Sequence, residues 1–108
     1  MRAVSEIPLT RLGCGTAAIG NHRVALTDAV AEEVLAAAWT AGVRHFDTAP
    51  YYGLGLAERR LGRFLAGVPR EDYVVSTKVG RLLEPNPGGA GDLDEDFVVP
   101  ATHRCVWD

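Results

Sequence analysis

The sequence predicts an α/β fold in which short parallel strands alternate with helices, equivalent to about the first three units of a (β/α)8 (TIM) barrel. Strand and helix patterns alternate along residues 12–78 with short connections, which is typical of parallel strands with right-handed crossovers. Strand ends at Gly15, Asp47 and Lys78 recur at intervals of about 30 residues. Eight such units would give about 240 residues, close to the roughly 250 of a complete barrel. Because 108 residues allow one domain at most, we interpret residues 1–108 as the N-terminal part of a single barrel domain.

The first strand and helix are predicted from glycine boundaries and helical periodicity. Leu12–Ala17 is short, apolar and glycine-bounded, as expected of a buried strand that leads into a loop. Asp28–Ala41 is predicted to be a helix, which Thr27 or Asp28 can cap and Gly42 can end. Its apolar residues at helical spacing predict one buried face, formed by Val30, Val34, Ala37, Ala38 and Ala41.

Two further strands flank a second helix. Val43–Thr48 and Tyr73–Lys78 are rich in β-branched and aromatic residues and are predicted to be strands. Leu56–Ala66 is predicted to be the helix between them, and its expected buried residues are Ala57, Leu61, Phe64 and Leu65. The same helix carries Arg59, Arg60 and Arg63, which we interpret as a solvated basic face rather than a ligand-binding patch.

The alternating pattern ends after residue 80. Residues 81–96 are predicted to be a loop, because the stretch Glu84–Asp96 is rich in proline, glycine and acidic residues. Phe97–Asp108 is expected to be an apolar tail that no further element follows, so that Trp107 has nothing to pack against.

Composition limits the classes of function. Apolar residues make up 47% and charged residues 23%, with a net charge of −3, which is typical of a globular protein and excludes the basic surface that nucleic acids or anionic membranes require. The sequence shows neither an apolar run long enough to cross a bilayer nor a secretory leader. Cys14 and Cys105 are expected to be free thiols in a cytoplasmic protein. Since His103 beside Cys105 lacks further ligands at metal spacing, no metal site is predicted.

A glycine-rich turn follows the first strand. Gly13–Ala18 fits the G-x-G-x-x-A form of a dinucleotide-binding turn, and Glu32 or Glu33 lies near the distance at which a ribose is held. That mechanism needs a helix to begin directly after the glycines. Ile19–His22 has a low propensity to form a helix. We therefore favour a tight turn that lines a site, and a small Rossmann-like nucleotide binder stays a weak alternative.

Three polar residues are expected to meet at one rim of the sheet. Asp47 and Lys78 end neighbouring parallel strands, and Tyr52 follows Asp47 by five residues. Taken singly, they also fit a loop-forming Asx turn, a solvated lysine and a packing tyrosine. Together they make a chemical unit, because an ammonium stabilises a phenolate and a carboxylate orients the ammonium. Such a phenol can protonate a carbonyl oxygen while hydride reaches the carbonyl carbon.

Three segments carry a resemblance to a known family: LTRLGCGTAAIGN, RHFDTAPYYGLGLAERRLG and PREDYVVSTKVG. They resemble the N-terminal part of the aldo-keto reductases, in particular the bacterial aldose, fucose or galactose 1-dehydrogenases and the pyridoxal dehydrogenases. The resemblance implies an NAD- or NADP-dependent oxidoreductase acting on an aldehyde, a ketone or a sugar. It further implies that Tyr52 is the proton donor or acceptor, that Lys78 lowers its pKa, that Asp47 holds Lys78, and that Gly15, Thr16 and Asp47 lie at the nicotinamide.

The resemblance also implies parts that these residues do not supply. In the family a histidine at the end of the fourth strand completes the catalytic group, and none of His22, His45 and His103 has that context. The nucleotide-phosphate loops follow later strands. We therefore expect this chain alone to be incomplete for catalysis. The alternative is a non-catalytic truncated remnant or interaction module, which self-associates through exposed sheet edges.

Overall fold

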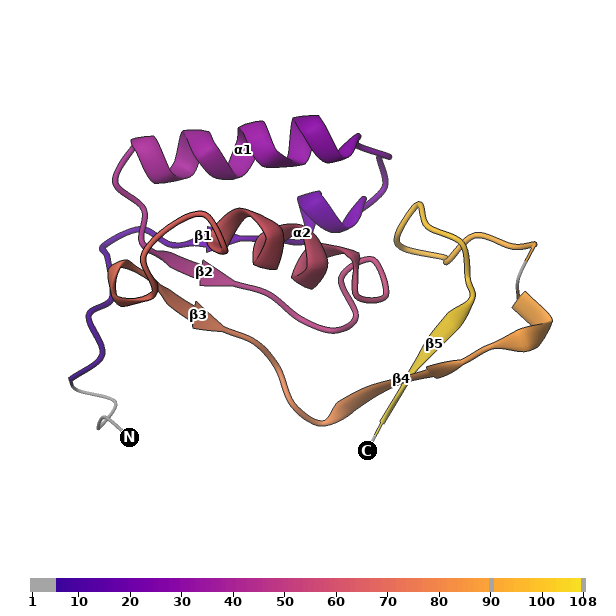
Figure 1. Cartoon of the computed structure of the whole chain (residues 1–108). Helices are drawn as coiled ribbons and strands as arrows, with labels where there is room; N and C mark the ends of the chain where they lie inside the picture. The colour runs from indigo at the N-terminus through magenta and orange to yellow at the C-terminus, as the bar shows by residue number, and fades with distance from the viewer. Residues whose placement is uncertain (1–5, 90, 108) are drawn as a thin grey trace.

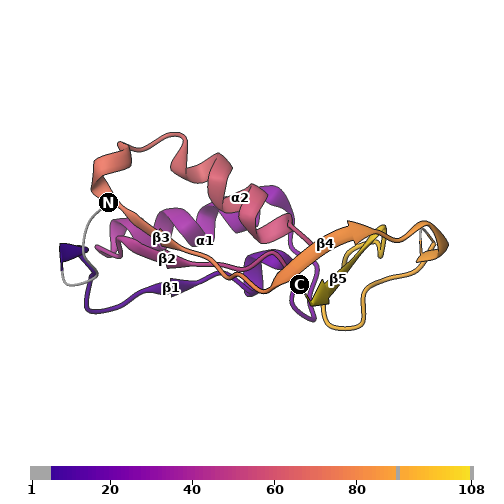
Figure 2. The same cartoon turned by 90° about the horizontal axis from the view of Figure 1, so that it is seen from below.

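The computed structural model describes residues 6–89 and 91–107, and its centre is a small parallel sheet. The strands β1 (Cys14–Gly15), β2 (His45–Asp47) and β3 (Val74–Ser76) lie in the order β1-β2-β3. Helices α1 (Asp28–Thr40) and α2 (Leu56–Leu65) form the crossovers. Both helices lie on the same side of the sheet (Figures 1 and 2). The predicted α/β fold with parallel neighbouring strands is therefore confirmed.

The register of the sheet brings the strand ends together. Cys14 pairs with Phe46, and Gly15 pairs with Asp47. On the other side of β2, Asp47 pairs with Ser76. The predicted polar residues thus lie at one edge, where the carboxyl ends of the strands meet.

The core lies between the sheet and its two helices. It is formed by Ile19, Ala31, Leu35, Phe46, Ala57, Leu61 and Leu65. For α2 the predicted buried face is confirmed at Ala57, Leu61 and Leu65. Thr27 caps α1 as predicted, since its hydroxyl accepts a hydrogen bond from the backbone N–H of Val30 at 3.1 Å.

The predicted buried face of α1 is confirmed at Ala38, which packs against the core, and is otherwise wrong by one residue. Ala31 and Leu35 face the core, whereas Val30 and Val34 are 41% and 43% exposed. The helix is apolar on most of its circumference, so stripes starting at residue 30 and at residue 31 both satisfy helical spacing. Only contact with the sheet selects between the two stripes.

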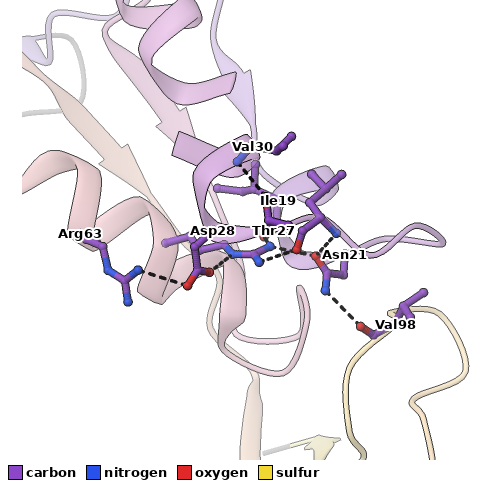
Figure 3. A network of polar contacts seen from close by, with 9 residues as sticks. Ile19, Asn21, Thr27, Asp28, Val30, Arg63 and Val98 are labelled. Atoms are coloured by element: carbon purple, nitrogen blue, oxygen red, sulfur yellow. Dashed lines mark hydrogen bonds and ion pairs between the residues drawn. The ribbon is translucent and has the colours of Figure 1, made fainter. Parts of the chain in front are cut away.

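The prediction of a solvated basic face on α2 is wrong for Arg60. Its side chain is 8% exposed and pairs with Asp28, Nε to Oδ1, at 2.9 Å. Its other N–H groups donate to the carbonyls of Ile19 and Leu26 and to the side-chain oxygen of Asn21. Figure 3 shows Ile19, Asn21 and Asp28 close together in this network, with the Asn21 side chain pointing toward Val98. Arg60 is therefore a structural centre for the loop that leads into α1.

The predicted loop over residues 81–96 is wrong at its first five residues, which form a strand. Strands β4 (Arg81–Pro85) and β5 (His103–Trp107) form an antiparallel hairpin, in which Arg81 pairs with Trp107. Figures 1 and 2 show this hairpin beyond the carboxyl ends of β1–β3. The partners in its ladder are 18 to 26 residues apart in the chain, so local composition could not indicate the pairing.

The segment between β4 and β5 packs against the loop that precedes α2. Phe97 and Val99 are buried and form a second cluster with Leu54. The ring of Phe97 lies 5.2 Å from the ring of Tyr51 and 6.0 Å from that of Tyr52, between centroids. The hairpin is thus attached to the loop that carries the two tyrosines.

Two further observations concern the part of the chain that the structure describes. Cys14 and Cys105 are both free thiols. None of the described helices is long and apolar enough to cross a membrane.

Candidate active site

Asp47 and Lys78 form an ion pair at the carboxyl ends of β2 and β3. The Lys78 ammonium donates to Asp47 Oδ2 at 2.8 Å and to the backbone carbonyl of Thr48 at 3.0 Å. The hydrogen bond from Lys78, together with a second one from Ser76, lowers the pKa of Asp47. The same contact with Asp47 raises the pKa of Lys78. Both groups are therefore held in their charged forms at neutral pH.

Ser76 and His45 extend this pair, and the sequence interpretation did not include them in the site. The Ser76 hydroxyl donates to Asp47 Oδ1 at 2.7 Å, and His45 Nε2 lies 2.9 Å from the same hydroxyl. A hydroxyl has one hydrogen, so His45 Nε2 must donate to Ser76. In a strand, alternate residues lie on the same side, so the sequence places Ser76 on the same side as Lys78. This spacing is the sequence feature that indicates Ser76 as a member of the site.

Tyr52 lies beside the ammonium of Lys78. Lys78 Nζ is 5.2 Å from the centroid of the Tyr52 ring. The phenol is a smaller contributor to the raised pKa of Lys78, after Asp47. The structure thus brings together the three residues that the sequence placed at one rim: Asp47, Tyr52 and Lys78.

Glycines fix the backbone that carries Tyr52. A Cβ on Gly20 would stand 2.8 Å from the Tyr52 carbonyl carbon and 2.9 Å from its oxygen. The following Gly53 has φ +67°, and Gly55 has φ +97°, which is the left-handed region that favours glycine. The turn at Ala18–Gly20 therefore contacts the tyrosine loop backbone to backbone. Larger side chains at residue 20 would move Tyr52.

The predicted cofactor residues Gly15 and Thr16 occupy different environments. Gly15 is exposed, and a Cβ built on it would have no atom within 4 Å, which leaves room for a flat ring. Thr16 is buried, and both its N–H and its hydroxyl donate to the backbone carbonyl of Asp47 at 3.0 Å. Thr16 therefore positions Asp47, and its hydroxyl is already engaged.

The glycine turn does not open a helix, as the Rossmann-like alternative requires. Residues Ala18–Gly20 form a single 3-10 turn, and α1 begins only at Asp28. The phosphate-binding N-terminus that the motif needs is thus absent from this stretch. The Rossmann-like alternative is wrong.

A cavity of ≈ 300 Å³ opens beside the candidate group. Tyr52 and Lys78 line it together with Arg81 and Trp107 from the hairpin. The charged pair and the phenol therefore border a space that a small molecule can enter. Among the described residues, no cluster of three or more His, Cys, Asp or Glu side chains is arranged to hold a metal ion.

Comparison with known proteins fits this geometry. The profile of the Aldo/keto reductase family matches residues 11–101. The chain belongs to this family. It is 52% identical to D-threo-aldose 1-dehydrogenase of Pseudomonas sp, over 98% of this chain and 33% of that protein. It is 43% identical to pyridoxal 4-dehydrogenase of Microbacterium luteolum, over 77% of this chain and 24% of that protein.

A solved structure confirms the fold within the family. The glycerol dehydrogenase of Gluconobacter oxydans superposes with a TM-score of 0.67 at 31% identity, over 95% of this chain and 28% of that one. The predicted partial TIM barrel of an aldo-keto reductase is thereby confirmed, as is the likeness to aldose and pyridoxal dehydrogenases. The chain spans about a third or less of the length of these relatives.

Proposed function

We propose that this chain supplies the proton-transfer part of an NAD(P)-dependent oxidoreductase that interconverts a carbonyl group and an alcohol on a small sugar or aldehyde. The observation that carries the proposal is the contact of the Lys78 ammonium with both Asp47 and the ring of Tyr52. The relatives named for aldoses, pyridoxal and glycerol support the class of substrate.

Tyr52 is the group that moves the proton in this proposal. In reduction its hydroxyl donates a proton to the substrate oxygen, and in oxidation its phenolate accepts that proton. Lys78 stabilises the phenolate through its charge. Asp47 holds the ammonium in place, and Ser76 with His45 holds the second oxygen of Asp47.

The cofactor is proposed to lie against the carboxyl end of β1. When bound, a nicotinamide supplies or accepts the hydride at the substrate carbon. Gly15 fits this use because the space over its Cα is open. Asp47 and Thr16 would border the same place, with Thr16 acting through the backbone of Asp47.

A chimera tests the proposal. Residues 1–108 of this chain replace the matched third of D-threo-aldose 1-dehydrogenase, and turnover is followed by nicotinamide absorbance. We expect steady turnover that falls by about 10²–10⁴-fold in Tyr52→Phe, which is the contribution of a general acid–base group. Tyr73→Phe, at the opposite end of β3, is the matched control and should remain active.

The chain alone provides the complementary measurement. We expect no nicotinamide-linked carbonyl reduction from residues 1–108 by themselves. Steady turnover of this chain that disappears in Tyr52→Phe would contradict that expectation. A chimera in which Tyr52→Phe keeps full activity would contradict the role of Tyr52.

A further inference from the structure

We propose that Ser76 and His45 are positioning residues, which lock the Asp47 carboxylate in the orientation that the proton transfer needs. In that orientation one carboxylate oxygen faces the Lys78 ammonium. Gly13 leaves the space in which the ring of His45 lies. We call the side chains of Ser76 and His45 the relay. This inference rests on the proposed function and extends it to side chains that do not line the cavity at the candidate site.

The relay lies on the face of the sheet that the helices leave uncovered. Phe46 is fully buried in the core between the sheet and its helices. Side chains alternate along a strand, so His45 and Asp47 point to the opposite face, away from α1 and α2 (Figure 2). Asp47 pairs with Ser76 across the β2–β3 ladder, which brings these two side chains next to each other. The register of the sheet therefore builds the relay.

The two oxygens of the Asp47 carboxylate have different partners. Oδ1 accepts the hydroxyl hydrogen of Ser76 at 2.7 Å, and Oδ2 accepts from the Lys78 ammonium at 2.8 Å. The χ2 torsion of an aspartate is broad, so a single partner leaves the plane of the carboxylate free to turn. With both oxygens bonded, any turn of that plane breaks a hydrogen bond. Ser76 therefore fixes the plane from the side opposite to Lys78.

His45 determines where the hydroxyl hydrogen of Ser76 points. A serine hydroxyl has one hydrogen, which rotates toward whichever acceptor is available. The Nε2 atom of His45 lies 2.9 Å from the Ser76 oxygen and donates to it, which leaves the hydroxyl hydrogen for Asp47. Hydrogen bonds that follow one another in a chain polarise and strengthen each other. The donor on His45 therefore strengthens the hold of Ser76 on the carboxylate.

Gly13 explains how the ring of His45 can lie in this place. A Cβ on Gly13 would stand 3.2 Å from Nδ1 of His45 and 3.4 Å from its backbone oxygen. A side chain at residue 13 would therefore push against the imidazole. Gly13 is the first glycine of the G-x-G-x-x-A pattern. In this fold it makes room for the relay rather than for a dinucleotide.

The relay is not needed to hold the strands together. Strands β2 and β3 pair through their backbones along their whole length. Beyond the ladder, the N–H of Thr48 donates to the carbonyl of Ser76 at 2.8 Å. These backbone bonds fix Ser76 independently of its hydroxyl. Loss of the hydroxyl should therefore free the carboxylate and leave the sheet intact.

Carboxyl ¹³C titration of Asp47 in the full chain tests the positioning without any turnover. Ser76→Ala should raise the pKa of Asp47, because the hydrogen bond from Ser76 is the second cause of its lowering, after that from Lys78. Ser76→Thr keeps a hydroxyl and should restore the titration of the unmodified chain. Thr77→Ala is the matched control, because the Thr77 hydroxyl donates to Glu58 at 3.1 Å.

Substitutions at His45 repeat the test at the other end of the relay. His45→Phe keeps a ring without a donor and should raise the pKa of Asp47, by less than Ser76→Ala does. His45→Gln keeps an N–H donor and should restore the titration. His103→Phe, at an exposed position of β5, should change nothing. Gly13→Ala should shift the imidazole signals of His45, because its Cβ crowds the ring.

In the chimera the same substitutions should act on kcat rather than on KM. Ser76→Ala should lower kcat about tenfold, which is the effect of one hydrogen bond on a rate. KM should stay the same, because the relay does not line the cavity. Ser76→Thr should restore kcat. A change that only loosened the fold would not be restored by one hydroxyl.

The outcomes separate this inference from the proposed function. If Ser76→Ala leaves the Asp47 titration as unchanged as Thr77→Ala does, the relay is overturned and the test of Tyr52 still stands. A loss of kcat that Ser76→Thr does not restore would also overturn the relay. A raised pKa of Asp47 in Ser76→Ala, together with a chimera that Tyr52→Phe leaves fully active, would support the hold of the relay on Asp47 and count against the proposed function.

Discussion

Replacement of Arg60 by methionine should strongly destabilise the chain although the residue lies on the arginine-bearing side of α2. The guanidinium donates to the carbonyl of Ile19 at 3.0 Å, to the carbonyl of Leu26 at 2.7 Å and to the side chain of Asn21 at 2.8 Å. It also pairs with Asp28. Methionine keeps most of the buried stem and removes every donor, so the test isolates the polar contacts.

The magnitude follows from the burial of those contacts. A hydrogen bond to a charged group contributes about 1.5–3 kcal/mol, and a buried acceptor left without its donor costs about 1–3 kcal/mol; Arg60→Met leaves three such acceptors. We expect a loss at the lower end of their sum, about 3–5 kcal/mol, since some freed carbonyls can turn to water. The total free energy of unfolding of a domain of this size is only about 5–15 kcal/mol. The melting temperature should fall by roughly 15 °C or more.

The assay is urea unfolding followed by circular dichroism, with Arg63→Met as the matched control. Arg63 lies one turn away on the same helix and binds the same Asp28 at 3.3 Å, but its side chain is 70% exposed. Exposed pairs contribute little to stability, so its midpoint should match that of the unmodified chain. Equal losses in the two variants, or a loss below about 1 kcal/mol in Arg60→Met, would refute the reasoning.

Two other changes test the geometry around the phenol and the ion pair. Gly20→Ala should lower the free energy of unfolding by about 1–3 kcal/mol and displace Tyr52, because the new Cβ meets backbone atoms. Gly62→Ala is the control: its Cβ meets nothing within 4 Å, so the change should stabilise the helix by up to about 1 kcal/mol. The urea midpoint reports the stability of each variant, and the amide signal of Tyr52 reports its displacement. Lys78→Met should raise the pKa of Asp47 toward its ordinary value, measured by carboxyl ¹³C titration, because Lys78 is the main cause of its lowering. In the unmodified chain the pair stabilises above pH about 3.9 and this contribution is lost as pH falls through the lowered pKa of Asp47. At the alkaline end it is lost as pH rises through the raised pKa of Lys78.

The rim of the sheet could be predicted from the sequence because its determinants are local. Asp47 ends β2 and Lys78 follows the end of β3 by two residues, and parallel order puts neighbouring strand ends side by side. The buried face of α1 could not be predicted in the same way. Its two candidate stripes, at Val30 and at Ala31, differ only in which one meets the sheet.

Arg60 and the hairpin could not be predicted because their partners are distant in the chain. In sequence Arg60 lies among arginines at helical spacing, which is typical of a solvated face. Its acceptors are 32 to 41 residues away, in the loop before α1. Likewise, β4 lies at the start of a proline- and glycine-rich stretch and itself ends in Pro85, and its strand identity depends on pairing with β5. Long-range contacts of this kind override local propensity.

Asn21 connects these distant contacts with the candidate site. Its side chain accepts hydrogen bonds from Arg60 and from the backbone N–H of Leu26, and it donates to the carbonyl of Val98 at 3.1 Å. Its own backbone carbonyl accepts from the N–H of Val98 at 2.8 Å. Asn21 thus links the segment between β4 and β5 to α2 through hydrogen bonds to Val98 and Arg60.

The residue before Asn21 is Gly20, whose backbone abuts that of Tyr52. A substitution at Arg60 would therefore displace both Tyr52 and the segment between β4 and β5, because both contact the turn that contains Gly20 and Asn21. This arrangement explains why a buried arginine outside the site is needed there. Strand register brings the ends of β2 and β3 together, and hydrogen bonds from Thr16 and Ser76 then hold Asp47. Tyr52 lies in a loop, and the segment between β4 and β5 is held to that part of the molecule by the side-chain hydrogen bond of Asn21 to Val98.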